Sequence, residues 1–241
     1  MVATKSKTIK VKIWRGDHEG EMQTYEVARR DNQTVLDVVT EVQKKLEPSL
    51  AYRYSCRVGV CGTCAIMVNG EPRWACRTHV SKVAKDDELT LEPLRNMPRI
   101  KDLVVNMDEF FAKWQHVGSD FKSERTRDDK PYEVSPKSAK RRKANAAIEC
   151  INCGICYAAC DVVGWDNNYL GPAALNRAWT LVNDVRHVGS SETLKKASAE
   201  GGCGSCHTQG SCMTYCPVSL SPTGSIAGLK RASLFSFLKR D

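Results

Sequence analysis

The chain has 241 residues, 41% of them hydrophobic and 27% charged, with a formal net charge of +8 and twelve cysteines. This length and apolar content predict one or two folded domains and exclude a disordered chain. No apolar run approaches the roughly 18 residues of a membrane-spanning helix, and residues 1–10 lack the apolar segment of a signal peptide. We therefore expect a reducing compartment, where twelve cysteines favour metal binding over disulfides.

Residues 1–97 show the patterns of a small α+β domain. Apolar and polar residues alternate over 9–13 as in a half-buried strand, and apolar residues over 35–46 recur at helical spacing. The pair Asn69-Gly70 is a strong β-hairpin signal. Alternating leucines over 89–91 indicate a last strand.

The first four cysteines follow the spacing C-x4-C-x2-C-x11-C, and they are Cys56, Cys61, Cys64 and Cys76. The first three match the spacing of a plant-type [2Fe-2S] site. Gly59 and Gly62 lie between them and can adopt positive φ, which turns backbone N–H groups toward the sulfurs. A zinc site is the alternative, but zinc sites use two close cysteine pairs and fit this spacing poorly. With the elements around it, this part resembles the β-grasp fold of plant-type ferredoxins.

A connector follows over residues 98–143. Apolar residues from Leu103 to Trp114 recur at helical spacing, which predicts a helix after Pro98. Residues 118–143 then hold nine basic and five acidic side chains, with the densest positive charge at Lys140-Arg141-Arg142-Lys143. We interpret this stretch as a solvated linker and helix start, with a specific anion site as the alternative. It lacks interleaved aromatic residues, so it is a poor nucleic-acid signal.

The next four cysteines follow the spacing C-x2-C-x2-C-x3-C, and they are Cys150, Cys153, Cys156 and Cys160. This is the bacterial ferredoxin run, in which the fourth cysteine ligates the other of two clusters. Asp161 follows the run at the position where Pro is usual. The crossed arrangement assigns one [4Fe-4S] cluster to the thiolates of Cys150, Cys153, Cys156 and Cys216.

A second run is obtained by reading backward from Cys216-Pro217, but Gln209 stands where one of its thiolates belongs. Three thiolates remain for this cluster, and they come from Cys160, Cys206 and Cys212. An amide is a poor iron ligand beside thiolates, so we expect a three-iron [3Fe-4S] cluster. Cys203 is left over in a glycine-rich stretch, either as a mobile free thiol or as a fourth ligand that swings in.

Helical spacing after Gly171-Pro172 and after Pro222 predicts that the second domain is mainly helical. The expected fold class is α+β, with an N-terminal β-grasp plant-type [2Fe-2S] ferredoxin domain and a mainly α-helical bacterial-ferredoxin-like domain. The expected boundaries are 1–97 for the first domain, 98–143 for the connecting helix and basic linker, and 144–241 for the helical domain that binds both other clusters.

Three cluster sites in this order closely resemble the iron–sulfur subunit of succinate dehydrogenase and fumarate reductase. The motifs that carry the resemblance are residues 55–64, 100–105, 150–160, 170–173 and 206–217. The resemblance implies the electron-transfer subunit of a succinate:quinone oxidoreductase of the tricarboxylic acid cycle. Such a subunit passes single electrons through [2Fe-2S], [4Fe-4S] and [3Fe-4S] clusters and does not itself bind the dicarboxylate.

The resemblance also implies partners and a place in the cell. The expected partners are a flavoprotein subunit that holds FAD, one or more membrane anchor subunits that can carry haem b, and a quinone, but no nucleic acid. The sequence has no GxGxxG fingerprint of its own for FAD. Trp165 and His207 match the family's quinone site. The expected location is peripheral, on the cytoplasmic face of a bacterial inner membrane.

Several alternatives stay open at this stage. The complex can run in reverse as a fumarate reductase, or the chain can serve a related thiol- or disulfide-linked fumarate reductase, although it lacks the extra cysteine-rich segments typical of those. A third alternative is a zinc-binding module whose basic linker contacts nucleic acid. Residues 201–229 contain no Asp, Glu, Lys or Arg. We interpret this stretch as buried against a cluster and a membrane anchor, with cluster packing alone as the other explanation.

Overall fold

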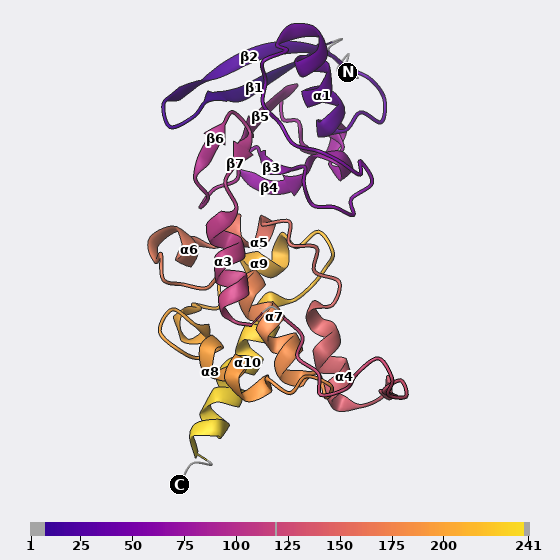
Figure 1. Ribbon diagram of the computed structural model, residues 1–241. Helices are drawn as coiled ribbons and strands as arrows, with labels where there is room; N and C mark the ends of the chain where they lie inside the picture. The colour runs from indigo at the N-terminus through magenta and orange to yellow at the C-terminus, as the bar shows by residue number, and fades with distance from the viewer. Residues whose placement is uncertain (1–7, 119, 239–241) are drawn as a thin grey trace, which may run out of the picture. The chain divides into compact units, whose positions relative to one another are not determined.

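The computed structural model describes residues 8–118 and 120–238. Residues 1–7, 119 and 239–241, which the predicted segments include, lie outside the described residues. Contacts divide the chain into two compact units (Figure 1). The first, here the sheet unit, comprises residues up to Met107 together with Cys153–Ala158, and the second, the helical unit, comprises Asp108–Asn152 and the chain from Ala159 onward. The sequence-based boundaries after residues 97 and 143 stay a prediction.

The sheet unit contains a mixed five-stranded sheet in the order β2-β1-β5-β3-β4. Its strands are β1 (Thr8–Gly16), β2 (Gly20–Ala28), β3 (Ala65–Val68), β4 (Glu71–Trp74) and β5 (Glu88–Glu92). β1 pairs antiparallel with β2 and parallel with β5. Ile9, Val11 and Ile13 on β1 are fully buried, so the predicted alternation is confirmed. The arrangement agrees with the predicted ferredoxin-like domain.

Local sequence signals explain the elements around this sheet. Thr34 and Asp37 form a capping box that starts α1 (Val35–Glu41), which continues as a π-helical turn over Val42–Leu46. Asn69 and Gly70 both have positive φ, of 49° and 80°, as the predicted hairpin turn between β3 and β4 requires. The remaining short elements of the unit are a 3-10 turn at Ala75–Arg77, α2 (Val80–Val83), β6 (Arg99–Lys101), β7 (Val104–Val105) and α5 (Ile155–Ala158).

The helix predicted from Leu103 onward begins later than expected. The segment after Pro98 forms β6 and β7, and α3 (Asp108–His116) starts only at Asp108. The cause is Asp102, whose side chain is 1% exposed and whose φ is +50°. Its carboxylate accepts hydrogen bonds from the N–H of Gly16 at 2.9 Å, the N–H of Ala51 at 2.7 Å and the guanidinium of Arg15 at 3.0 Å. These distant partners hold the backbone in a turn that helical periodicity does not reveal.

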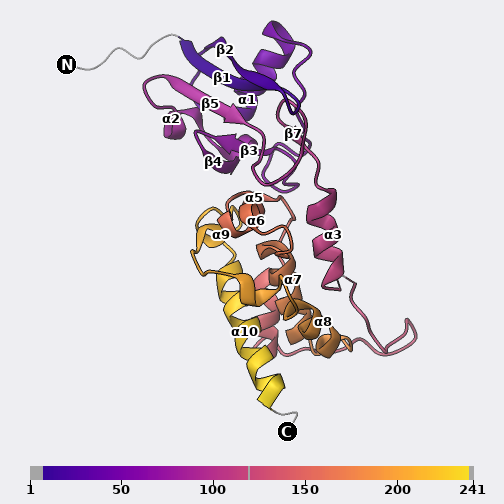
Figure 2. The ribbon, with the colours of Figure 1, turned by 90° about the vertical axis from the view of Figure 1, so that its left-hand side faces the viewer.

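Two long helices form the centre of the helical unit. α7 (Pro172–Asn183) begins with Pro at its first turn, after Gly171 with φ +86°, and α10 (Pro222–Leu238) begins at Pro222, so both predicted helices are confirmed. The two run side by side (Figure 2). Gly228 permits this approach, because a Cβ atom there would lie 2.5 Å from the ring of Trp179.

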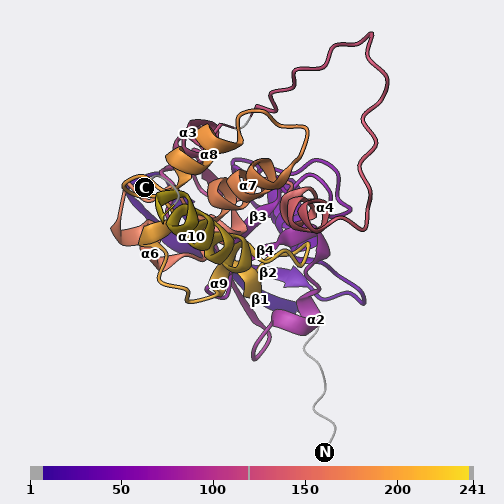
Figure 3. The ribbon, with the colours of Figure 1, turned by 90° about the horizontal axis from the view of Figure 1, so that it is seen from below.

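The other elements of the helical unit are short. They are α3, α4 (Ala139–Ala144), α6 (Asp161–Trp165), α8 (Ser190–Ala197), α9 (Ser211–Thr214) and 3-10 turns at Asn145–Ala147 and Cys203–Ser205. Between α3 and α4 the described part of the connector forms a long loop without helix or strand (Figure 3). In residues 8–118 and 120–238, no helix has both the length and the apolar character needed to cross a bilayer.

Candidate iron–sulfur sites

All twelve cysteines lie in the described residues, and no disulfide joins any two of them. The described residues also contain no group of three or more His, Cys, Asp or Glu side chains placed to hold a single metal ion. A cluster is bound differently, because its thiolates are distributed over two or more irons and so stand farther apart than the ligands of a single ion.

The first set lies wholly within the sheet unit. Cys56, Cys61 and Cys64 lie on the loop before β3, and Cys76 lies in the 3-10 turn after β4. The N–H groups of Val60 and Cys61 both donate to the Cys56 Sγ, at 3.3 Å each. These hydrogen bonds lower the pKa of Cys56 to about 6. The loop is thus shaped to present N–H groups to a sulfur anion, as a cluster site requires.

The glycines of this loop take the backbone conformation that the sequence suggested. Gly59 has φ +77° and Gly62 has φ +74°. Tyr52, which sequence reasoning missed, donates its hydroxyl to the carbonyl oxygen of Cys64 at 3.1 Å. Burial raises the pKa of Tyr52 well above its usual value, and the neighbouring thiols add to this effect. No spacing rule singles out this tyrosine.

The second set is distributed over the two units. Cys150 and Cys216 belong to the helical unit, whereas Cys153 and Cys156 belong to the sheet unit. Burial raises the pKa of Cys150, the charge of Cys216 adds to this, and the charge of Arg177 opposes it. Leu220 donates its N–H to the Cys216 Sγ at 3.3 Å.

The third set lies wholly within the helical unit, at Cys160, Cys206 and Cys212. Burial raises the pKa of Cys212, and the charges of the other two thiols add to the rise. The structure therefore brings these three sulfurs into one neighbourhood. The N–H of Thr208 donates to the Cys206 Sγ at 3.4 Å, and the hydroxyl of Thr223 lies 3.2 Å from the Cys212 Sγ.

Two residues beside the third set were not found from the sequence. Tyr169 is 1% exposed, and its pKa is raised first by burial and then by the charges of Cys206 and Cys160. The ammonium group of Lys230, on α10, donates a hydrogen bond to the carbonyl oxygen of Cys206 at 2.8 Å. Only the fold brings these residues to the site.

The positions matching a quinone site lie close together. The rings of Trp165 and His207 have centroids 5.8 Å apart, at an interplanar angle of 48°. Trp165 is 62% exposed, which is unusual for a side chain of this size. Both side chains are exposed and follow cysteines of the third set in the sequence, so an outside molecule can contact them.

Cys203 is a free thiol that is 3% exposed and lies in a 3-10 turn. Its role as a free thiol or as a fourth ligand stays a prediction. Burial raises the pKa of Cys203, and the charge of Lys230 opposes the rise.

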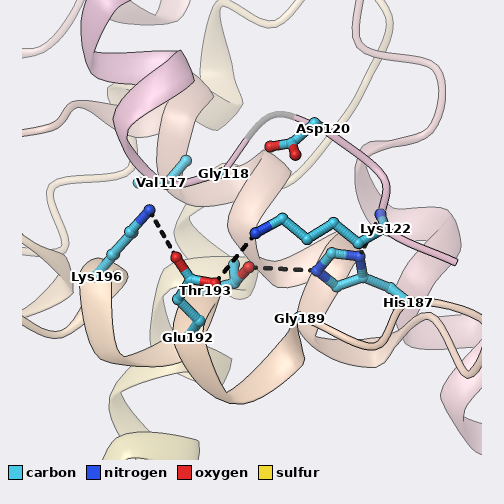
Figure 4. A pocket seen from close by; sticks show the side chains of 9 residues that line it. All are labelled: Val117, Gly118, Asp120, Lys122, His187, Gly189, Glu192, Thr193 and Lys196. Carbon is cyan, nitrogen blue, oxygen red and sulfur yellow. Dashed lines mark hydrogen bonds and ion pairs between the residues drawn. The ribbon is translucent and has the colours of Figure 1, made fainter. Parts of the chain in front are cut away.

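A separate small cavity lies in the helical unit (Figure 4). Its volume is about 20 Å³, enough for a single water molecule and too small for an organic substrate. His187 in its wall accepts a hydrogen bond at Nδ1 from the N–H of Lys122 at 3.0 Å, and its Nε2 lies 3.4 Å from the hydroxyl of Thr193. Burial lowers the pKa of His187. The cavity is therefore lined by a neutral histidine that serves the local structure.

Comparisons with known proteins agree with this arrangement. A family described as a 2Fe-2S iron-sulfur cluster binding domain matches residues 8–112, and a family described as a 4Fe-4S dicluster domain matches residues 149–221. The fumarate reductase iron-sulfur subunit of Haemophilus influenzae is 34% identical, over 87% of this chain and 85% of that protein. The mitochondrial succinate dehydrogenase [ubiquinone] iron-sulfur subunit 1 of Oryza sativa is 33% identical, over 95% of this chain and 83% of that protein.

A solved structure gives the same result. A chain of the Mycobacterium smegmatis Sdh1 complex in the apo form is similar with a TM-score of 0.86 at 28% identity, covering 98% of this chain and 99% of that one. The [2Fe-2S] and [4Fe-4S] domains, their order and the overall fold are shared. The chain belongs to the family of iron–sulfur subunits of succinate dehydrogenase and fumarate reductase, and its role is electron transfer within an oxidoreductase complex.

Proposed function

We propose that this subunit transfers single electrons between the FAD of a flavoprotein subunit and a membrane quinone. Three bound clusters, [2Fe-2S], [4Fe-4S] and [3Fe-4S], would supply the one-electron chemistry. The observation that carries the proposal is the third set of thiols in the helical unit, beside an exposed Trp165 and His207. The chain's own residues hold the clusters, tune them and contact the quinone.

The proposed ligands follow the crossed arrangement of the sequence. Backbone N–H groups donate to one sulfur in each set, at Cys56, Cys216 and Cys206. Such hydrogen bonds stabilise negative charge on sulfur and so favour bound, reducible clusters. The proposed ligand sets are Cys56, Cys61, Cys64 and Cys76 for [2Fe-2S], Cys150, Cys153, Cys156 and Cys216 for [4Fe-4S], and Cys160, Cys206 and Cys212 for [3Fe-4S].

The third site is proposed to hold three irons because it has three thiolates. Gln209 occupies the position of the fourth, and its amide donates to the carboxylate of Asp161 at 3.1 Å. An amide is a poor iron ligand beside thiolates, so Gln209 does not replace the missing cysteine. Cys203 stays outside the ligand sets in this proposal.

The quinone is proposed to bind at Trp165 and His207. The indole N–H and the imidazole can donate hydrogen bonds to a quinone oxygen, and the imidazole can hold or move a proton there. Lys230 supports this site through its hydrogen bond to the Cys206 carbonyl.

The proposed partners are a flavoprotein subunit and one or more membrane anchor subunits, with or without haem b. Residues 201–229, which carry no charged side chain, form much of the surroundings of the third set. Such a stretch suits burial against an apolar partner better than exposure to water. We therefore propose a peripheral position on the cytoplasmic face of a bacterial inner membrane.

Co-purification and depletion of the chain test this assignment. The chain should co-purify from membranes with a flavoprotein, and the complex should couple succinate oxidation to reduction of an added short-chain quinone. Depleting this chain should leave succinate-dependent reduction of a dye at the flavin but abolish quinone reduction. Quinone reduction that survives depletion would contradict the proposal.

A further inference from the structure

Asp161 carries its carboxylate close to the third set of thiols. It directly follows Cys160, which is the N-cap residue of α6, so Asp161 is the first residue of that helix. Its carboxylate is exposed and accepts a hydrogen bond from the Gln209 side-chain amide at 3.1 Å. Gln209 lies between Cys206 and Cys212 in the sequence. One hydrogen bond therefore joins the segment of the first ligand to the loop that carries the other two.

The carboxylate of Asp161 meets an uncharged loop. The loop that meets it belongs to residues 201–229, which contain no Asp, Glu, Lys or Arg. No ion pair is formed by Asp161 among the described residues. Its hydrogen bond partner, Gln209, is neutral and holds the carboxylate without cancelling its charge.

We propose that the Asp161 carboxylate lowers the reduction potential of the cluster held by Cys160, Cys206 and Cys212, and that Gln209 fixes the carboxylate in place. The inference rests on the proposed ligand set. Reduction adds one negative charge to a cluster, and a fixed anion nearby makes that addition less favourable. Because the carboxylate is exposed, water screens it, and we expect an effect of about tenfold on the redox equilibrium, which is 59 mV for a one-electron couple.

The test separates the charge from the hydrogen bond. Asp161→Asn keeps an oxygen that accepts from Gln209 but removes the charge. Asp161→Pro removes both and suits the first position of a helix, where Pro is favoured. Gln209→Ala keeps the charge but releases it. Asp166→Asn is the matched control, because it removes one carboxylate charge at the other end of α6 while retaining an acceptor for the Asn168 N–H.

The measurement is a potentiometric titration of the assembled complex, followed by the EPR signal of the oxidised third cluster. We expect the potential to rise by a similar amount in Asp161→Asn and Asp161→Pro, to rise less in Gln209→Ala, and to change least in Asp166→Asn. An unchanged potential in Asp161→Asn, or an equal shift in Asp166→Asn, would overturn the inference.

Failure of the proposed function is a different result. If the third site of the unmodified complex gives a four-iron signal, the assigned cluster type is wrong. The same titration, followed by that four-iron signal, still measures the effect of Asp161, so the two failures are distinguishable.

Discussion

Gly62 lies directly against Cys153: a Cβ atom at residue 62 would stand 2.6 Å from the Cβ atom and 2.9 Å from the Cα atom of Cys153. Gly62 lies between two proposed ligands of the [2Fe-2S] cluster, and Cys153 is a proposed ligand of the [4Fe-4S] cluster. The segments proposed to hold the [2Fe-2S] and [4Fe-4S] clusters therefore touch within the sheet unit. A contact this close leaves no room for any side chain at residue 62.

The first prediction concerns this contact. Gly62→Ala should reduce [2Fe-2S] occupancy and lower thermal stability, because Ala is strained at φ +74° and collides with Cys153. Gly70→Ala is the matched control, since Gly70 has φ +80° but nothing within 4 Å of its Cβ position. The control should cost only the backbone strain, about 1–2 kcal/mol. Cluster content by absorbance and melting temperature measure both, and equal effects would show that the contact is unimportant.

Local patterns predicted much of this fold because they depend on near neighbours. The hairpin at Asn69-Gly70 and the helix after Gly171-Pro172 need only turn chemistry and an N-terminal proline, and both are present. The prediction of a helix within residues 98–107 was wrong, because the hydrogen-bond partners of Asp102 come from the end of β1 and from Ala51, which are distant in the sequence. No local pattern contains that information.

The candidate sites show the same division. Cysteine spacing predicts ligand sets because cluster geometry restricts how thiolates follow one another in a chain. Tyr169 and Lys230 have no such spacing, and only packing brings them to the third set. The hydrogen bond between Gln209 and Asp161 likewise joins residues that are 48 positions apart.

The second prediction tests the cluster type of the third site. Gln209→Cys should convert a three-iron into a four-iron cluster, because it supplies the missing thiolate. The EPR signal of the oxidised three-iron cluster should then disappear from the isolated complex. Thr208→Cys adds a thiol one residue out of register and should leave that signal intact. A full three-iron signal in Gln209→Cys would count against the ligand assignment.

The third prediction concerns the quinone. His207→Ala should lower quinone reduction at least tenfold while dye reduction at the flavin stays near the wild-type rate, because the imidazole is proposed to contact the quinone and not the flavoprotein. His116→Ala changes another exposed histidine of the helical unit and should leave both rates unchanged. If His207→Ala impairs the two activities equally, His207 is structural.

The fourth prediction is a pH dependence of stability. Burial lowers the pKa of His187, partly offset by the charges of Asp120 and Asp184. The unfolded chain then binds a proton more readily than the folded one, so the stability that neutral His187 contributes is complete above about pH 6.5 and is lost as the pH falls toward the lowered pKa. Melting temperatures between pH 7.5 and 5.5 should decline less in His187→Asn than in wild type. An exposed control, His116→Asn, should keep the wild-type slope.

Metal and sulfide analysis of the anaerobically purified protein, joined to EPR, decides whether the chain holds three iron–sulfur clusters. Three clusters of the proposed types require about nine iron atoms and about ten acid-labile sulfides per chain. EPR should show a three-iron signal in the oxidised protein and additional signals from the [2Fe-2S] and [4Fe-4S] clusters after reduction. Zinc in place of iron, with no acid-labile sulfide, would contradict the proposed electron-transfer function.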